Sequence, residues 1–229
     1  MSPEGDAHSN APNRGKGRLV ALVVGALLVA VGFALGLVSE RVGGTTDSQP
    51  APSAVDIGFL QDMSVHHHQA TEMSAAILTT TEDAEVRNLA FDILTGQENQ
   101  IGQMHGWLQI WDEPLLPLNG FMGWMDPDDE DHAGHMDHSE PMGQMPGMAS
   151  PAEMAQLRAA QGTERDVLFL QLMLRHHDGG IPMMEYAIEH ADVPVVRNIA
   201  SSMLDGQTKE IGLITMMLDQ RGAEPLPMN

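Results

Sequence analysis

The chain contains an internal repeat, and this repeat constrains the fold more than any other feature of the sequence. Residues 56–119 align with residues 166–229 at a constant offset of 110 residues, without a gap, and 21 of the 64 aligned positions are identical. Both copies begin with one pattern of Phe, Leu, Gln, Met and paired His, and both continue with Val-Arg-Asn, Gly-Gln and Ile-Gly. Any ligand of such a chain is expected to bind twice, or between the copies.

Each copy is predicted to form a helical hairpin. From position 59 to position 77, apolar, His or Met side chains recur in alternating steps of four and three residues, the period of an amphipathic helix. The first copy is therefore expected to contain a helix at 55–80 and a second one between the capping residues 81–83 and Pro114. The second copy is expected to contain helices at 164–190 and 194–221, preceded by a short capped helix at 151–161.

Four long helices, with short turns within each copy and one long connection between the copies, predict an all-α four-helix bundle. Neither copy alone could bury both of its faces, so residues 55–229 are expected to form one domain. Within it, repeat one covers 55–119, a Met- and His-rich loop covers 120–150, and repeat two with the short helix covers 151–229.

The first forty residues differ from the rest of the chain. Residues 19–38 carry no charge, and a helix of this length crosses a hydrocarbon core of about 30 Å. The basic residues within 1–18 place this N-terminus in the cytoplasm, and the remainder of the chain outside. A cleaved signal peptide is the alternative, but its apolar stretch is usually about 7–15 residues long and ends at a small-x-small site. We therefore expect a single-pass membrane anchor followed by a flexible stalk at 39–54.

Beyond the anchor the chain is strongly acidic, with 29 Asp and Glu against 7 Lys and Arg from Val42 onward. This charge repels nucleic acid and anionic lipid head groups and attracts cations. The sequence contains no Cys, so a metal site has no thiolate ligand. The commonest structural zinc ligand sets are thereby excluded.

In each copy, two imidazoles and two thioethers fall on one face of the first helix, within an arc of about 120°. These side chains are Met63, His66, His67 and Met73 in the first copy, and Met173, His176, His177 and Met183 in the second. Thioether and imidazole suit Cu(I), and imidazole also suits Cu(II), whereas Mg²⁺, Ca²⁺ and Mn²⁺ prefer oxygen. The pattern therefore predicts a copper site, and silver shares the preference of Cu(I) for thioether.

Packing alone is the competing interpretation, because Met on a helical seam is normally core filler. Paired His residues duplicated in register are harder to explain in this way, since each buried imidazole needs a polar partner. On the second helix, Gln97, Met104 and His105 lie on or beside the same inner seam, and Met104 is a further candidate ligand. Its counterpart in the second copy is Ile214, so the two halves are expected to differ.

The loop between the copies carries a second, weaker metal signal. Met and His recur there at a spacing of three residues beside the acidic run 126–131, and His-rich tracts are typical of metal binding. A disordered acidic linker is the alternative, because the segment has little apolar surface with which to order itself. The candidate ligands in the loop are His132, His135, His138, Met142, Met145 and Met148.

Enzyme signatures are absent from the sequence. A di-iron oxidase on a helical bundle needs Glu-x-x-His motifs, and none occurs here. No His-Glu-x-x-His, phosphate-binding loop or Gly-x-Ser-x-Gly is present either. We therefore expect no catalysis, with a structural or partner-binding bundle as the first alternative to copper binding and a metal-dependent oxidase as the second.

Two sequence segments resemble the bacterial family named domain of unknown function 305. One begins with Phe59 and the other with Phe169, and both run through the paired His residues. The resemblance covers essentially all of residues 55–229 and implies a ferritin-like four-helix fold. The family's downstream pattern, Gln-x-x-Glu-Ile-x-x-Met, departs once in each half of this chain, at Gln100 and at Ile214. In the family, paired His and following Met residues bind copper in at least one periplasmic member implicated in copper resistance. This implies ligand roles for His66, His67, Met73, His176, His177 and Met183.

The sequence thus predicts an extracytoplasmic, membrane-anchored protein that sequesters, buffers or delivers copper through His and Met ligands. A copper transporter or chaperone is the expected exchange partner. Nucleic acid is excluded as a partner by the charge, and the oligomeric state is not indicated.

Overall fold

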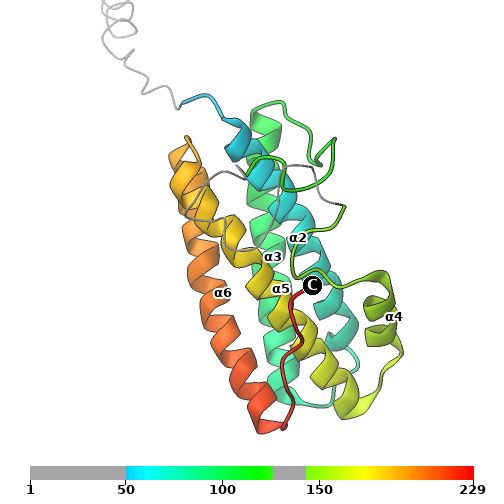
Figure 1. Ribbon diagram of the computed structural model, residues 1–229. Helices are drawn as coiled ribbons and strands as arrows, with labels where there is room; N and C mark the ends of the chain where they lie inside the picture. Colours follow the sequence, from blue (N-terminus) through cyan, green and yellow to red (C-terminus); the bar gives the residue numbers. More distant parts are fainter. Residues whose placement is uncertain (1–49, 126–142) are drawn as a thin grey trace, which may run out of the picture. The chain divides into compact units, whose positions relative to one another are not determined.

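The computed structural model describes residues 50–125 and 143–229, and this part of the chain contains five helices and no strand. The helices are α2 (Ala54–Leu78), α3 (Ala84–Ile110), α4 (Pro151–Ala159), α5 (Gly162–His190) and α6 (Pro194–Gln220) (Figure 1). Their bounds lie close to those expected from the sequence, and the prediction of an all-helical bundle is confirmed. The proposed membrane segment, 19–38, lies outside the described residues, and no helix within them is long and apolar enough to cross a membrane.

Side-chain caps determine where three of the helices begin. Ser53 and Asp56 form a capping box at α2, in which each side chain accepts a hydrogen bond from the backbone amide of the other residue. Ser150 and Glu153 form the same arrangement at α4. The side chain of Asp83 accepts hydrogen bonds from two backbone amides in the first turn of α3. These interactions are local in sequence, which is why the boundaries could be predicted.

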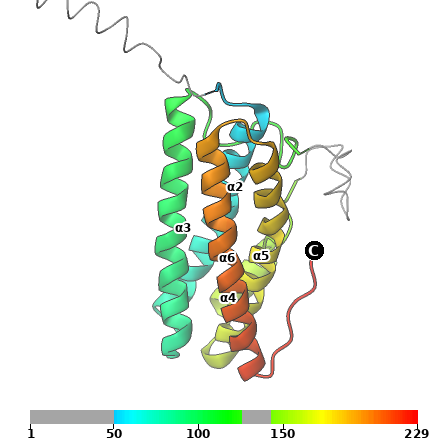
Figure 2. The same cartoon turned by 90° about the vertical axis from the view of Figure 1, so that its left-hand side faces the viewer.

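The four long helices form two antiparallel hairpins, α2 with α3 and α5 with α6, which pack against each other through α2 and α5 (Figures 1 and 2). The short helix α4 lies against both α2 and α5. Residues 50–229 form one compact unit.

Two Gln residues at equivalent positions of the repeat form hydrogen bonds with the segment that follows each hairpin. The side-chain amide of Gln61 donates a hydrogen bond of 2.6 Å to the carbonyl oxygen of Pro114, and that of Gln171 donates one of 2.6 Å to Glu224. The two donors are 110 residues apart, and so are the two acceptors. The repeat in the sequence is therefore also a repeat of tertiary contacts.

A layer of polar side chains divides the core into two apolar clusters. Along α2, Met63 belongs to the first apolar cluster, Ala70 and Met73 belong to the second, and the paired His residues lie between them. The other three long helices also pass from one cluster to the other through buried polar residues. We call this set the polar layer; it consists of His66 and His67 on α2, Gln97 on α3, His176 and His177 on α5, and Gln207 on α6.

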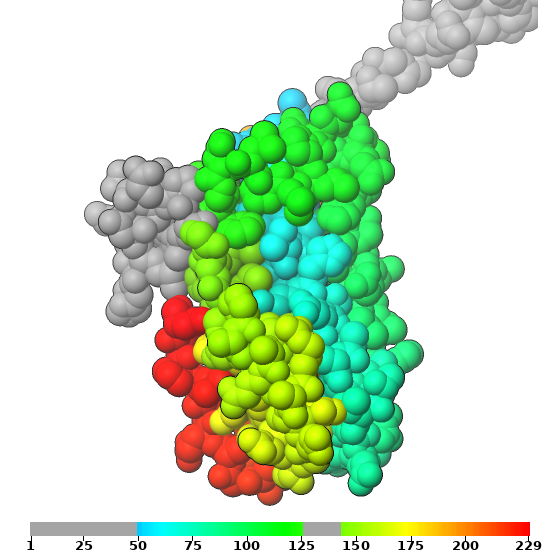
Figure 3. Space-filling view, turned by 90° about the vertical axis from the view of Figure 1, so that its right-hand side faces the viewer, coloured from blue at the N-terminus to red at the C-terminus, as the bar shows by residue number. Residues whose placement is uncertain are grey.

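Residues 143–150, which we call the strap, run along the bundle before α4. Gln69 of α2 holds the strap by two hydrogen bonds with the backbone of Ala149, one of 2.8 Å to its carbonyl oxygen and one of 2.6 Å from its amide. The side-chain amide of Asn229 donates a hydrogen bond of 2.9 Å to the carbonyl oxygen of Met148. Figure 3 shows the yellow-green surface of the strap and α4 beside α2.

The strap approaches α5 so closely that only glycine fits at the contact. Gly147 has a φ of 75°, and a Cβ added there would lie 2.4 Å from the carbonyl oxygen of Arg175. A Cβ added at Gly179 would lie 2.3 Å from the carbonyl oxygen of Pro146. Backbone therefore packs on backbone, and the strap closes this side of the polar layer.

Candidate metal centre

Four histidines occupy the middle of the bundle, where α2 packs on α5. The side chains of His66, His67, His176 and His177 are fully buried. The ring centroids of His66 and His176 are 3.8 Å apart, with 35° between the ring planes. Because these two residues are equivalent in the repeat, the tertiary structure brings the corresponding imidazoles of the two copies face to face.

The inner pair of imidazoles, His66 and His176, donates hydrogen bonds to backbone carbonyls. Nε2 of His176 lies 2.8 Å from the carbonyl oxygen of His66. Nε2 of His66 lies 3.2 Å from the carbonyl oxygen of Pro146, in the strap. The strap thus interrupts the internal symmetry, because it supplies the acceptor for only one of the two equivalent rings.

The outer pair of imidazoles, His67 and His177, donates to side chains on the second helix of its own hairpin. Nε2 of His67 lies 2.8 Å from Oε1 of Gln100, and Nε2 of His177 lies 2.6 Å from Oε2 of Glu210. These two acceptors are again equivalent positions of the repeat. One is a neutral amide and the other a carboxylate, so the two halves of the site differ in charge.

These hydrogen bonds select the tautomer of each ring. All four acceptors are oxygen atoms, so each Nε2 carries its hydrogen, and in a neutral ring the lone pair is then on Nδ1. None of the four Nδ1 atoms has a hydrogen-bond partner, although all are buried. A buried polar atom without a partner is costly, and a metal ion is one species that would satisfy a ring nitrogen in this state.

Burial lowers the pKa of three of these imidazoles. The pKa of His66 falls to about 4, and that of His67, which also lies near the positive charge that His66 would carry, falls to about 3. The pKa of His176 is lowered well below its ordinary value, first by burial and then by the neighbouring imidazoles. The three rings are therefore neutral at neutral pH, the form in which imidazole binds a metal.

Thioethers lie in the apolar clusters on both sides of the polar layer. Met63 and Met183 belong to the first apolar cluster together with Met104, and all three are fully buried. Met73 and Met173 belong to the second cluster and are also fully buried. The antiparallel packing of α2 on α5 thus brings the first Met of one copy into the same cluster as the last Met of the other.

The two Gln residues of the polar layer have no hydrogen-bond partner. Gln97 and Gln207 are only 4% and 3% exposed, and the nitrogen and oxygen of both side-chain amides are unpaired. Gly180 of α5 provides room beside them, since a Cβ added there would lie 3.3 Å from Oε1 of Gln207 and 3.4 Å from Cε1 of His66. The unsatisfied amides and imidazoles therefore belong to one region of the core.

Within the described residues, no group of three or more His, Asp or Glu side chains is arranged to hold a metal ion. A metal centre in this region would therefore depend on Met sulfur as well as on imidazole. His68, the third His of the first run, is exposed and lies near half-buried His105, their ring centroids 5.9 Å apart. This pair is separate from the polar layer.

The candidate ligands in the loop are only partly described. Met145 is buried in the first apolar cluster, and Met148 is partly buried against it. His132, His135, His138 and Met142 lie outside the described residues. The prediction that the loop captures metal stays a prediction.

The sequence patterns did not identify the hydrogen-bond partners of the four imidazoles. Gln100 and Glu210 are each 33 residues beyond the His that they contact, and this constant spacing within the repeat is the signal that could have paired them. Pro146 had no comparable signal, because its contact depends on the path of the strap.

The domain of unknown function family DUF305 matches residues 56–218, a range that includes the whole polar layer and nearly all of both hairpins. The chain belongs to this family. The resemblance of the two paired-His segments to this family is thus confirmed. No curated protein matches the chain.

Solved structures of related proteins share the fold of this domain. A DUF305 protein from Streptomyces coelicolor, described as secreted, is 41% identical over 76% of this chain and 97% of its own, with a TM-score of 0.66. A DUF305 fragment from Deinococcus radiodurans is 28% identical over 75% of this chain and 99% of its own, with a TM-score of 0.59. CopM in its Cu(I)-bound form is 22% identical over 72% of this chain and 96% of its own, with a TM-score of 0.54. At this identity the likeness to CopM shows a common fold.

Proposed function

We propose that this protein binds copper in the polar layer through imidazole Nδ1 atoms and the flanking thioethers, and that it sequesters, buffers or delivers the ion without catalysis. The observation that carries the proposal is the set of four buried imidazoles, each with an unpaired Nδ1. Structural histidines in a core normally have both nitrogens satisfied or one nitrogen in contact with water.

Copper is favoured by the chemistry of the available ligands. Imidazole and thioether together suit Cu(I), and imidazole alone suits Cu(II). The first apolar cluster contains eight buried Met residues and the second contains four, so Cu(I) is expected to prefer the side of the layer that faces the first cluster. CopM, which shares the fold, has been solved in Cu(I)-bound, Cu(II)-bound and silver-bound forms, and this supports the same class of ion here.

The proposed setting is extracytoplasmic. One relative with the same fold is described as a secreted protein, and the uncharged segment 19–38 is proposed to anchor the ferritin-like bundle in the cell membrane. In that position the acidic domain would attract cations, and a copper transporter or chaperone is the proposed exchange partner.

Competition titration of the purified full chain tests the proposal. Cu(I) under anaerobic reducing conditions, Cu(II) and Zn²⁺ are each titrated against a chelator of known affinity. We expect tight Cu(I) binding in the wild type and its loss when His66, His67, His176 and His177 are replaced together by Ala. His68→Ala is the matched control, because His68 is exposed on the same helix and should leave binding unchanged. Full copper stoichiometry in the fourfold variant would refute the site.

Because four truncations in the core can also unfold the protein, a second variant changes the thioethers and keeps their volume. Met63→Leu with Met183→Leu is expected to weaken Cu(I) binding more than Cu(II) binding, since both changes conserve packing. Met184→Leu, in the same cluster and equally buried, is the control.

Thermal unfolding separates copper binding from a purely structural bundle. A ligand that binds only the native state at 100 times its Kd adds about 2.7 kcal/mol to stability by mass action. The melting temperature should therefore rise with Cu(I) in the wild type. An unchanged melting temperature, together with weak and nonselective binding of all three ions, would favour the structural or partner-binding bundle.

A further inference from the structure

The polar layer is closed on most of its sides. The two apolar clusters cover it at both ends along the bundle axis. The strap covers part of the remaining surface, where backbone packs on backbone at Gly147 and Gly179. An ion that exchanges with the layer needs a polar path, and none of these three boundaries offers one.

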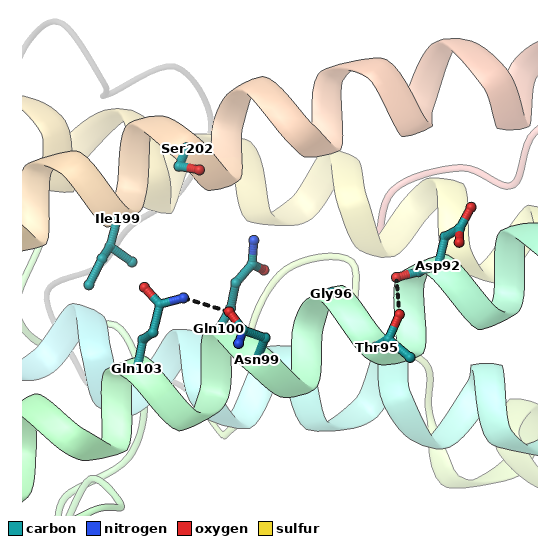
Figure 4. A pocket seen from close by; sticks show the side chains of 8 residues that line it. All are labelled: Asp92, Thr95, Gly96, Asn99, Gln100, Gln103, Ile199 and Ser202. Carbon is teal, nitrogen blue, oxygen red and sulfur yellow. Dashed lines mark hydrogen bonds between the residues drawn. The ribbon is translucent and has the colours of Figure 1, made fainter.

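The boundary between α3 and α6 is different. A cavity of about 40 Å³ lies there, and the residues that line it include Gly96 and Gln97 on α3 and their equivalents Gly206 and Gln207 on α6. Gly96 and Gln100 also line a larger open groove of about 430 Å³ on the outside of the same two helices. Figure 4 shows this groove, with Asp92 and Asn99 on α3 and Ser202 on α6 among the residues around it.

The inner cavity has the properties of a hydrated space. The amides of Gln97 and Gln207 line it, and neither amide has a protein partner despite being at least 96% buried. A site holds water when it offers polar partners and at least about 10–15 Å³, and this cavity meets both conditions. Apolar side chains at these positions would have avoided the cost of unpaired amides.

The same cavity lies beside the side chains that accept hydrogen bonds from two of the imidazoles. Gln100 and Glu210 line it and accept the hydrogen bonds of His67 and His177. Gln207 also lies beside Gly180, next to the ring of His66. Two of the residues that line the cavity are therefore hydrogen-bonded directly to imidazoles of the polar layer.

We propose that the cavity between α3 and α6 is the port through which a soft monovalent cation, Cu(I) or Ag⁺, reaches and leaves the polar layer. The amide oxygens of Gln97 and Gln207 replace water around the ion as it passes. Gly96 and Gly206 keep the outer side open, because neither has any atom within 4 Å of an added Cβ. This port rests on the proposed function, since it serves the same metal centre.

If the cavity is the port, side chains that obstruct it should slow Cu(I) binding and release and leave the equilibrium affinity for Cu(I) unchanged. Gly96→Leu with Gly206→Leu places two bulky apolar side chains at the opening. Gly102→Leu with Gly212→Leu is the matched control, because these glycines are on the same two helices, are equally open and line neither the cavity nor the groove. Both double variants replace glycine by a better helix former, so both should fold. A milder Gly96→Ala with Gly206→Ala variant should give an intermediate effect.

The measurement is the rate of Cu(I) release from the loaded full chain into excess chromogenic chelator, at concentrations where the rate no longer depends on the chelator. Equilibrium Kd is measured in parallel by competition. We expect release in the Gly96→Leu, Gly206→Leu variant to slow by about tenfold or more with an unchanged Kd, because a blocked path slows binding and release by the same factor. The control should match the wild type.

The outcomes separate the port from the site. Unchanged release in the obstructed variant, with wild-type Kd, overturns the port alone. A larger Kd without slower release also overturns the port, because the substitutions would then affect the bound ion and not its path. If the wild-type chain binds no Cu(I) at all, the proposed function fails and the port fails with it.

Discussion

At the scale of single residues, one pair of equivalent acceptors gives the two halves of the site different charges. Gln100 accepts the hydrogen bond of His67, whereas Glu210 accepts that of His177. A carboxylate that accepts from one ring nitrogen makes the other nitrogen a stronger metal ligand. The half of the site that contains His177 should therefore bind the more highly charged ion, Cu(II), more tightly.

Glu210→Gln tests this asymmetry. The change keeps the shape of the acceptor and removes its charge, so Cu(II) affinity is expected to fall by about tenfold or more. Gln100→Glu is the reciprocal variant and should raise Cu(II) affinity. Competition titration of both variants measures the effect, and equal affinities in Glu210→Gln and the wild type would show that the carboxylate does not influence the site.

At the scale of elements, the strap depends on a contact that tolerates no side chain. Gly179→Ala would place a Cβ against the carbonyl oxygen of Pro146, which is the acceptor for His66. We expect a loss of roughly 1–3 kcal/mol in the free energy of unfolding, the usual cost of overpacking a rigid contact. Urea denaturation measures this loss.

Gly102→Ala provides the comparison for that experiment. It lies within a helix with nothing near an added Cβ, so it should be neutral or slightly stabilising. If both variants have the same stability, the strap moves away from α5 at little cost and does not seal the polar layer.

An ion pair between Glu153 and Arg175, 2.9 Å apart, joins α4, which directly follows the strap, to α5. The hydrogen bond with Arg175 and, after it, the capping contacts with Ser150 together lower the pKa of Glu153 to about 2. Because the pKa is depressed in the native state, the stabilisation is present above pH 4.5 and is lost as the pH falls toward 2. This ion pair is therefore lost only in strong acid.

At the scale of the whole molecule, the buried histidines make the apoprotein sensitive to mild acid. Their ordinary pKa is 6.5, and burial lowers the pKa to about 4 for His66 and about 3 for His67. Between pH 6.5 and these lower values, the unfolded chain binds protons that the native protein does not. The free energy of unfolding must therefore fall as the pH falls below 6.5.

We expect the melting temperature of the metal-free protein to decrease steadily from pH 7 to pH 5, a range in which the contribution of Glu153 does not change. His66→Gln with His67→Gln should flatten this dependence, whereas His68→Ala should not, because His68 is exposed. Calorimetry at matched ionic strength measures the trend. A melting temperature that does not change over this range would contradict the buried, neutral state of the imidazoles.

The sequence determined the elements and the chemistry of this protein because both depend on local or repeated patterns. Caps such as Ser150 with Glu153 act within one helical turn, and the periodicity from 59 to 77 marks the buried face of α2. The constant offset of 110 residues predicted two equivalent hairpins, and the paired His and Met residues predicted the ligand types.

Only the tertiary structure decided which nitrogen atoms of the paired His residues lack a hydrogen-bond partner. The patterns placed His66 and His176 on inner faces, but their stacking at 3.8 Å results from the packing of α2 on α5. The acceptors that hold each Nε2 and leave Nδ1 without a partner lie on α2, α3, α6 and the strap, far in sequence from the His that they contact. The physical reason is that helix formation is governed by contacts between residues three or four positions apart, whereas a hydrogen bond between helices exists only once their packing has fixed the position of both partners.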